Sequence, residues 1–499
     1  MRNFSKSKLL ALRQCPKRLW LEVHRPDLRC DTAAAQARFQ VGHQVGEVAR
    51  QLYDPEQKGV LVDVEAQGLE QAFAHSAALL QTRQPIFEAG FCASGAMAFA
   101  DVILPDEVEG RQAWRMVEVK SSTQVKEYHQ DDLAVQSFVA RAAGVQLTAV
   151  ALACIDSSWV YPGGGDYRGL LKEHDLTADA QARHEGVKGW IAQAQDVVAR
   201  EEAPAIAIGD QCDTPFECGF YAHCSRNEPQ PERPVYWLPR ISSDLVRDLA
   251  QQGIDDIRHV PDDVLNARQL RVKRHTLDGT VYFDAAGAAE DLARFPLPAQ
   301  FLDFETIQFA VPIWAGTRPY QQIPFQYSLH TLLADGTLQH REFLGIDGAD
   351  PSLALAQALI VDCASQQGPV FAYNAGFEKS RIGELAERFP QYAPALLAIS
   401  ARLVDLLPVA RERYYHPSQQ GSWSIKKVLP AVVPELRYDA LEGVRDGGMA
   451  MDAFLEALHP QTSVERKLTL QQQLLAYCKL DTYAMVRLWS IFSGSTLKV

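Results

Sequence analysis

Two short apolar segments carry charged residues at a spacing that suits cation-assisted chemistry. Asp303 and Glu305 alternate in "FLDFETIQF", and Glu118 and Lys120 alternate in "VEVK". In a β-strand, side chains two residues apart project to the same face. A carboxylate on a buried strand is costly unless it is paired or binds a metal. We therefore expect each pair to form part of a site.

The earlier segment gains a third charged residue from the strand expected before it. Asp101 follows "AMAFA", and the turn-rich "DEVEG" before "AWRMVEVKSS" predicts an antiparallel hairpin that brings Asp101 beside Glu118 and Lys120. The two carboxylates would hold Mg²⁺ or Mn²⁺, and the lysine would steady the nucleophile and the developing charge. This set suits phosphodiester hydrolysis. The alternative is an exposed strand with an ordinary ion pair.

The later segment has partners further along the chain. Tyr477 and Asp481 are four residues apart in "YCKLD" and share one face of the helix expected there. Glu378 begins another expected helix in "AYNAGFEKSRI", directly after a strand. These residues make a second candidate site for divalent cations.

Three of the nine cysteines are clustered in "CDTPFECGFYAHC", as Cys212, Cys218 and Cys224. Nine cysteines are too few for a disulfide scaffold in a chain of 499 residues, so a metal or cluster site is favoured. Four thiolates suit either Zn²⁺ or an iron–sulfur cluster. Structural zinc sites typically have closer pairs than these, which favours the bulkier cluster; unligated thiols are the third alternative.

The elements that must position these residues fall into two α/β groups. A length of 499 residues and a hydrophobic content of 47% indicate two or three domains. The proline-bearing, charged stretch "SRNEPQPERP" reads as a linker near residue 230. Helical and strand patterns alternate on both sides of it. We expect an α/β domain over 1–230, a small helical connector over 231–297, and a second α/β domain over 298–499.

Charge and hydropathy exclude some classes of protein. A net charge of −13 argues against coating nucleic acid by bulk attraction, although the basic first thirty residues could still form a local channel or simply a solvated helix face. We find no signal-peptide pattern and no apolar run of about 18 to 20 residues, so we expect a cytoplasmic protein with no membrane partner.

The first half resembles the RecB-like branch of the PD-(D/E)XK nuclease superfamily over roughly residues 5–228. The ordered motifs that carry the resemblance are Asp101, the strand with Glu118 and Lys120, and Gln136 in the following helix. The resemblance implies a restriction-endonuclease-like α/β fold. The branch usually has a histidine in an upstream helix, where "FQVGHQVGEVARQLY" has Gly46 instead; Glu47 or His43 could substitute, and we favour Glu47.

The same resemblance implies the fourth thiolate. Iron–sulfur members of the branch take one cysteine from near the N-terminus and three from a set after the nuclease motifs. Cys15 in "LRQCPKRLW" matches the first of these. Cys15, Cys212, Cys218 and Cys224 would then bind one [4Fe–4S] cluster that closes the domain on itself, with a structural role.

The last 200 residues resemble the DnaQ-like exonucleases of the RNase H-like superfamily, in the variant whose final motif is Y-x3-D. The resemblance implies that Asp303, Glu305, Glu378 and Asp481 hold two divalent ions and that Tyr477 orients the attacking water. It also implies removal of nucleotides from 3′ ends. The second motif of the family ends in Asp, where this chain has Glu378, and we read the nearby Asp405 as structural.

Together the two resemblances predict a metal-dependent DNA nuclease with two active sites and a structural cluster, acting on single strands or ends. There is no Walker A motif, so no helicase activity is expected. The alternatives are a nucleic-acid-binding scaffold with one or both sites inactive, and an RNA-processing 3′–5′ exonuclease.

Overall fold

A computed structural model describes residues 2–226 and 231–495 of the chain, and it shows a mixed α/β protein with two mixed sheets. The chain divides into two compact units. Unit 1 contains residues 1–229 together with Phe309–Tyr320, and unit 2 contains Gln230–Gln308 together with Gln321–Val499. Each unit has its own sheet and its own apolar core.

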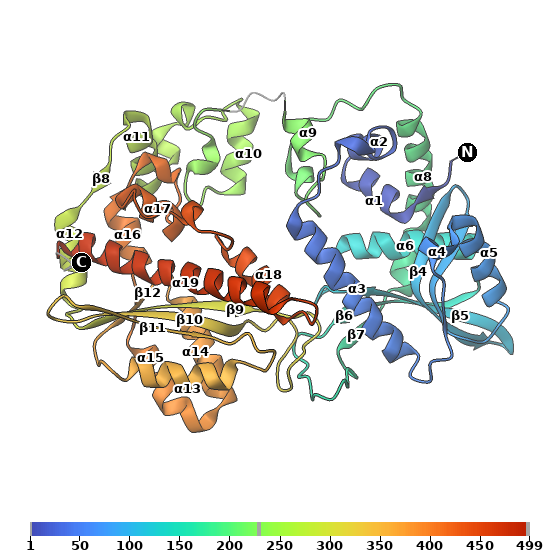
Figure 1. Ribbon diagram of the computed structural model, residues 1–499. Coiled ribbons are helices and arrows are strands. Elements are labelled where there is room, and N and C mark those ends of the chain that lie inside the picture. Colours follow the sequence, from blue (N-terminus) through green and yellow to red (C-terminus); the bar gives the residue numbers. More distant parts are fainter. Residues whose placement is uncertain (1, 227–230, 496–499) are drawn as a thin grey trace. The chain divides into compact units, whose positions relative to one another are not determined.

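The sheet of unit 1 has seven strands, of which six form the path β2-β3-β4-β5-β6-β7 while β1 pairs with β4 (Figure 1). The central hairpin, β4 with β5, is antiparallel, as the sequence predicts, and β5 pairs with β6 in parallel. The strands are β1 Phe4–Ser5, β2 Val60–Leu61, β3 Ile86–Ala93, β4 Ala96–Val108, β5 Arg111–Lys120, β6 Leu147–Ile155 and β7 Leu171–Asp175.

One helix of unit 1 is buried almost throughout, and it packs against β3, β4 and β6. This is α6, Glu127–Ala142, which follows the strand that carries Glu118 and Lys120. Its buried side chains include polar ones, so these must find partners within the protein. The other helices are α1 Lys6–Gln14, α2 Pro16–His24, α3 Ala33–Tyr53, α4 Val64–Gln67, α5 Leu69–Leu79, α7 Thr177–Ala182, α8 His184–Val198 and α9 Tyr221–Ser225.

The main sheet of unit 2 has five strands in the order β11-β10-β9-β12-β13. The central strand β9 is antiparallel to β10 and parallel to β12. Its side chains are largely buried, as expected of a strand covered on both faces. The strands are β9 Ala299–Ile307, β10 Ile323–Leu332, β11 Leu338–Leu344, β12 Val370–Ala372 and β13 Leu403–Asp405; β8 Tyr282–Phe283 pairs separately with β14 Tyr414–Tyr415.

Helices cover both faces of this sheet. The long helix α19 lies across one face and packs against β9 and β10, whereas α13, α14 and α15 lie on the other (Figure 1). Ser463 caps the start of α19, and Gly494 ends it in the left-handed conformation. The helices are α10 Ser243–Gln251, α11 Ala267–Asp278, α12 Ala285–Ala293, α13 Ser352–Cys363, α14 Gly376–Arg388, α15 Ala393–Ala401, α16 Leu407–Arg413, α17 Ile425–Val432, α18 Gly447–Leu458 and α19 Val464–Ser493.

The segment Phe309–Tyr320 follows β9 in the sequence but packs within unit 1. The Tyr161 amide donates to the Thr317 carbonyl at 2.9 Å, and the Tyr320 hydroxyl donates to the Ser121 carbonyl, one residue beyond Lys120. Across the described part of the chain, no helix is long and apolar enough to span a membrane.

Candidate functional site

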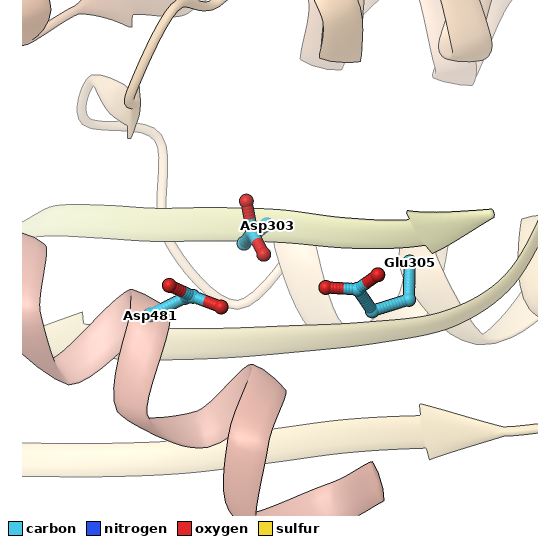
Figure 2. Close-up of side chains that lie close together, drawn as sticks. All are labelled: Asp303, Glu305 and Asp481. Atoms are coloured by element: carbon cyan, nitrogen blue, oxygen red, sulfur yellow. The ribbon is translucent and has the colours of Figure 1, made fainter. Parts of the chain in front are cut away.

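Three acids from two elements of unit 2 form a compact group, which we call the acidic cluster: Asp303, Glu305 and Asp481. Asp303 and Glu305 lie on β9, and Asp481 faces them from α19 (Figure 2). One carboxylate oxygen from each acid lies within 4.8 Å of the others. Among the described residues, no other three His, Cys, Asp or Glu side chains meet this closely. Three converging carboxylates are the donor set that hard divalent cations prefer.

The electrostatics of the acidic cluster favour a bound cation. Burial and the neighbouring carboxylates raise the pKa of Asp303 well above its usual value. Burial, followed by the charge of Asp481, raises the pKa of Glu305 to about 8, and burial raises the pKa of Asp481 to about 6. Like charges this close cannot all ionise without compensation. A divalent cation would supply that compensation.

Two tyrosines and one lysine surround the acidic cluster. The Tyr438 hydroxyl donates to Asp481 Oδ1 at 2.5 Å, and a hydrogen bond from Tyr477 also lowers the pKa of the Asp481 carboxyl. The Lys426 ammonium lies 5.0 Å from the centroid of the Tyr477 ring. It lowers the pKa of all three acids, although burial outweighs it. Tyr477 therefore lies where the sequence predicts it, and Tyr438 and Lys426 extend the site.

Glu378 lies near the acidic cluster but outside its compact group. It is in the first turn of α14, is 2% exposed, and its charge raises the pKa of Asp303. Its Oε2 atom is buried without a hydrogen-bond partner among the described residues. Burial raises the pKa of the Glu378 carboxyl to about 8. A buried carboxylate oxygen with no donor is a position that a cation could satisfy.

The turn before α14 is fixed by Asp405 at the end of β13. Asp405 Oδ1 accepts hydrogen bonds from the backbone amide of Asn374 at 2.9 Å and from the backbone amide of Leu407 at 3.0 Å. Asn374 has a φ of 71°, a left-handed conformation that asparagine tolerates better than most residues. Asp405 therefore stabilises the turn that positions Glu378. This agrees with the interpretation of Asp405 as a structural residue.

In unit 1, the predicted residues Asp101, Glu118 and Lys120 also meet, and we call them the hairpin cluster. Asp101 Oδ2 accepts from the Val119 amide at 2.7 Å. The Lys120 ammonium forms an ion pair with Glu118 Oε1, and the Gln136 amide donates to Glu118 Oε2 at 2.6 Å. All four side chains therefore lie together, as the hairpin and the following helix predict.

Two further residues complete the hairpin cluster: Lys6 from α1 and Asp132 from α6. The Lys6 ammonium lies 2.9 Å from both Glu118 Oε1 and Asp132 Oδ1, and Lys120 lies 2.7 Å from Asp132 Oδ2. Burial opposes ionisation of Glu118, but the two ammonium groups lower its pKa nonetheless. Burial and the Glu118 charge raise the pKa of Asp101. The cluster is a closed network of ion pairs around one strongly acidic carboxylate.

The structure does not bring Glu47 into the hairpin cluster. Glu47 is exposed on α3 and makes no ion pair within the described residues. The acid that does approach is Glu88 on β3, whose charge raises the pKa of Asp101. His43 lies near enough to lower the pKa of Glu88, although burial raises it overall. Of the two substitutes considered for the missing histidine, His43 is thus the one whose charge influences an acid near the site.

Most of the basic N-terminal residues form ion pairs. Arg13 pairs with Asp131, and Lys6 is part of the hairpin cluster. The other pairs are Arg18 with Glu22, Arg25 with Asp27, and Arg29 with both Asp31 and Glu22. Lys8 and Lys17 form no ion pair among the described residues, and the Lys17 ammonium donates to the Ile206 carbonyl at 3.5 Å. The region is therefore largely paired, and both interpretations of it stay predictions.

The four predicted cysteines line one small cavity of unit 1. Cys15 lies at the junction of α1 and α2, and Cys212, Cys218 and Cys224 lie in the last segment of the unit. All four are free thiols, and no three of their sulfur atoms lie within 4.8 Å of one another. Burial raises the pKa of Cys218 and Cys224, and the charges of the other cysteines add to this effect. The cysteines can influence one another's pKa values only if they lie close together.

Comparisons with known proteins give two matches. A family profile described as "Domain of unknown function (DUF2779)" matches residues 300–424. A protein of Mycoplasma pneumoniae named "Uncharacterized protein MG366 homolog" is 28% identical over 211 residues, which is 37% of this chain and 31% of that protein. The chain thus spans about a third of the length of the curated relative it matches. Neither name states an activity.

Sequence reasoning missed Lys6, Asp132, Lys426 and Tyr438. Asp132 had a usable signal, because it lies four residues before Gln136 and therefore shares its helix face. Lys426 follows a loop, and Tyr438 begins a short 3₁₀ helix, Tyr438–Ala440, so no periodicity marks either. Their roles depend on tertiary contacts alone.

Proposed function

We propose that this chain is a divalent-cation-dependent nuclease whose principal site is the acidic cluster of unit 2. The observation that carries the proposal is the convergence of Asp303, Glu305 and Asp481 within 4.8 Å, beside Tyr477 and Lys426. Buried acids with raised pKa values, gathered at one point, are typical of functional sites.

Asp303, Glu305 and Asp481 would hold the cation, with the buried Glu378 as a further ligand. Mg²⁺ or Mn²⁺ bound there would activate water and shield the charge of a phosphodiester. Tyr477 would orient the attacking water, and Lys426 would balance negative charge on the phosphate; the contacts of Tyr477 with Asp481 and of Lys426 with the Tyr477 ring support these roles. Tyr438 holds Asp481 in place through its hydroxyl.

The RNase H-like, DnaQ-like fold proposed for unit 2 has support in the topology. The acidic strand β9 is central in the sheet, and the helix that carries Tyr477 and Asp481 packs directly on it. We propose single-stranded DNA or DNA ends as the substrate and removal of nucleotides from 3′ ends as the reaction, with RNA as the alternative substrate.

The hairpin cluster is proposed as a second nuclease site, in a restriction-endonuclease-like, RecB-like unit. Supporting features are the meeting of Asp101, Glu118, Lys120 and Gln136, and the buried helix that supplies the last of these. Asp101 and Glu118 would be the cation ligands. Lys120 would stabilise the nucleophile and the developing charge.

We also propose that Cys15, Cys212, Cys218 and Cys224 hold a [4Fe–4S] cluster. Their position around one cavity supports a shared ligand. A single Zn²⁺ with Zn–S bonds of about 2.3 Å would draw the sulfurs to about 3.8 Å from one another. A [4Fe–4S] cluster is larger and holds its four thiolates further apart.

The proposed activity is tested with end-labelled single-stranded DNA and RNA of matched sequence, digested in Mg²⁺, Mn²⁺ or EDTA. We expect cation-dependent cleavage that Asp303→Asn lowers by about 100-fold or more, since removing a cation ligand removes most of the charge stabilisation. Lys120→Ala shows what share of the cleavage the hairpin cluster supplies. Asp263→Asn, an exposed acid on the connector, is the matched control and should cleave like the parent.

The competing function is a nucleic-acid-binding scaffold with inactive sites, which the position of Glu378 outside the compact group favours. Its signature would be binding of oligonucleotides that survives Asp101→Ala combined with Asp303→Ala, with no cleavage by the parent in any cation. Preference for RNA over matched DNA would instead indicate an RNA-processing enzyme.

A further inference from the structure

Unit 2 contains a large pocket that the acidic cluster does not account for. Its volume is about 720 Å³. The wall comes from five parts of unit 2 that lie apart in the sequence: the segment before α10, the start of α11, the turn after β12, α16, and the loop before α17. Its chemically distinctive lining residues are Tyr236, Arg240, Arg268, Tyr373, Arg411 and Trp423.

The pocket is basic in an otherwise acidic protein. Three arginines line it, and two of them, Arg240 and Arg411, have no ion pair within the described residues. Arg268 is paired with Glu412, yet its Nε atom is buried without a hydrogen-bond partner in the described part of the chain. Two uncompensated guanidinium groups beside a third create a positive potential that attracts phosphate.

Aromatic rings accompany these arginines. Tyr236 is 70% exposed, an unusual state for a large ring, and therefore offers a face for stacking. Tyr373 and Trp423 are held in position: the Tyr373 hydroxyl donates to the Trp423 carbonyl at 2.7 Å, and Trp423 Nε1 donates to the Tyr414 carbonyl at 2.7 Å. Exposed aromatic rings next to basic groups are typical of sites that bind single strands.

The loop before α17, which lines the pocket, is held in place by close contacts with neighbouring residues. Gly421 has a φ of 76°, and a Cβ atom there would lie 1.6 Å from the Trp237 carbonyl oxygen. Gln419 Nε2 donates to the Ser422 carbonyl at 3.0 Å. On the opposite wall, Gln269 Nε2 donates to the Pro239 carbonyl at 3.1 Å, which fixes the segment that carries Tyr236 and Arg240.

Two stretches that line the pocket lead along the chain to residues of the acidic site. Ile425 lines the pocket, and the next residue is Lys426, whose charge acts on the cluster acids. Asn374 also lines the pocket, and Glu378 follows four residues later. The pocket and the acidic cluster are therefore connected through the chain at two points.

We propose that this pocket binds the single-stranded nucleic acid of which one phosphodiester lies at the acidic cluster. Arg240, Arg268 and Arg411 contact backbone phosphates, and Tyr236 stacks on a base. The inference rests on the proposed nuclease function for its purpose, but the binding itself requires no cleavage. The pocket would hold the part of the strand beyond the reacting bond and would set the length of strand required.

The test measures binding without catalysis, using a fluorescent 12-nucleotide single strand in EDTA, as DNA and as matched RNA. We expect Arg240→Ala combined with Arg411→Ala to weaken binding by about 10-fold or more and to reduce the salt slope, log Kd against log salt, by about 1.4. Arg341→Ala, an exposed arginine on β11, is the matched control and should bind like the parent.

A second comparison isolates the aromatic contribution. Tyr236→Ala should weaken oligonucleotide binding by about 5-fold or more, since stacking on one base is lost. It should leave the binding of inorganic polyphosphate unchanged, because polyphosphate has charge but no bases. Circular dichroism confirms that each variant is folded.

The outcomes separate this inference from the proposed function. Parent-like binding by the double arginine variant overturns the pocket assignment, whether or not the parent cleaves. Pocket-dependent binding with no cleavage by the parent in Mg²⁺ or Mn²⁺ upholds the pocket and overturns the nuclease. Equal loss of polyphosphate and oligonucleotide binding in Tyr236→Ala overturns the stacking role.

Discussion

At the scale of single residues, the acids of unit 2 bind protons more readily than ordinary carboxyl groups do. Glu305 and Glu378 are buried and Asp303 is partly buried, and each of the three has a raised pKa. Raised carboxyl pKa values mean that the folded protein binds protons more tightly than the unfolded chain does. Without a cation, stability from these groups is therefore greatest at low pH and is lost as pH rises.

Glu378→Gln tests this at one position. The pKa of Glu378 rises from an ordinary 4.5 to about 8, so the destabilisation it causes grows between those values. In EDTA, we expect parent and variant to be equally stable near pH 4.5, and the variant to be more stable at pH 9 by about 2 kcal/mol or more. Urea unfolding at both pH values measures the difference. A difference in unfolding free energy between parent and variant that is independent of pH would show that Glu378 is not protonated in the folded state.

The contrast with unit 1 is also visible at this scale. Glu118 has its charge balanced by Lys6 and Lys120, so its pKa is lowered although it is buried. An acid of this kind needs no cation for stability, and its contribution is lost only as pH falls toward its lowered pKa. Glu118 therefore has a pH dependence of stability opposite to that of Glu378.

At the scale of elements, α19 and the loop before α17 decide the geometry of unit 2. The helix supplies Tyr477 and Asp481, and the loop leads from the pocket to Lys426. The loop depends on Gly421, which combines a left-handed backbone with close approach to Trp237. Only glycine meets both conditions.

Gly421→Ala should therefore be strongly destabilising, by about 3 kcal/mol or more, because the added Cβ would overlap the Trp237 carbonyl. Gly279→Ala is the matched control: Gly279 has a φ of 65° at the end of α11, but its Cβ position has no atom within 4 Å. Backbone strain alone should cost the control about 1 kcal/mol. Chemical denaturation compares the two. Equal losses would mean that the loop yields to the added carbon.

At the scale of the whole molecule, residues that are distant in the sequence meet within unit 1 in two places. Cys15, between α1 and α2, lines the same cavity as three cysteines about two hundred residues later in the sequence. Phe309–Tyr320 belongs to unit 1 although both of its flanking strands, β9 and β10, belong to unit 2. A crosslink between distant residues stabilises chiefly by restricting the unfolded chain.

Cys15→Ser tests the proposed cluster. We expect anaerobically purified parent to contain iron and acid-labile sulfide, and the variant to lose both and to unfold at a temperature lower by about 5 °C or more. Cys30→Ser is the control, since Cys30 is exposed and does not line the cavity. Zinc in place of iron in the parent would contradict the cluster and support the smaller structural site.

The sequence by itself determined the residues that meet within one element or one hairpin. Alternation placed Asp303 beside Glu305 and Glu118 beside Lys120, and helix spacing paired Tyr477 with Asp481, because these relations depend only on the periods of strand and helix. The β4–β5 hairpin was also predictable, since its turn is local.

Tertiary structure decided everything that joins separate elements. It placed Lys6 between Glu118 and Asp132, Tyr438 on Asp481, and Glu47 on an exposed face. It assigned Phe309–Tyr320 to unit 1 and formed the basic pocket from five separate stretches. No local period encodes such contacts, because they follow from how buried apolar faces pack against one another across the whole chain.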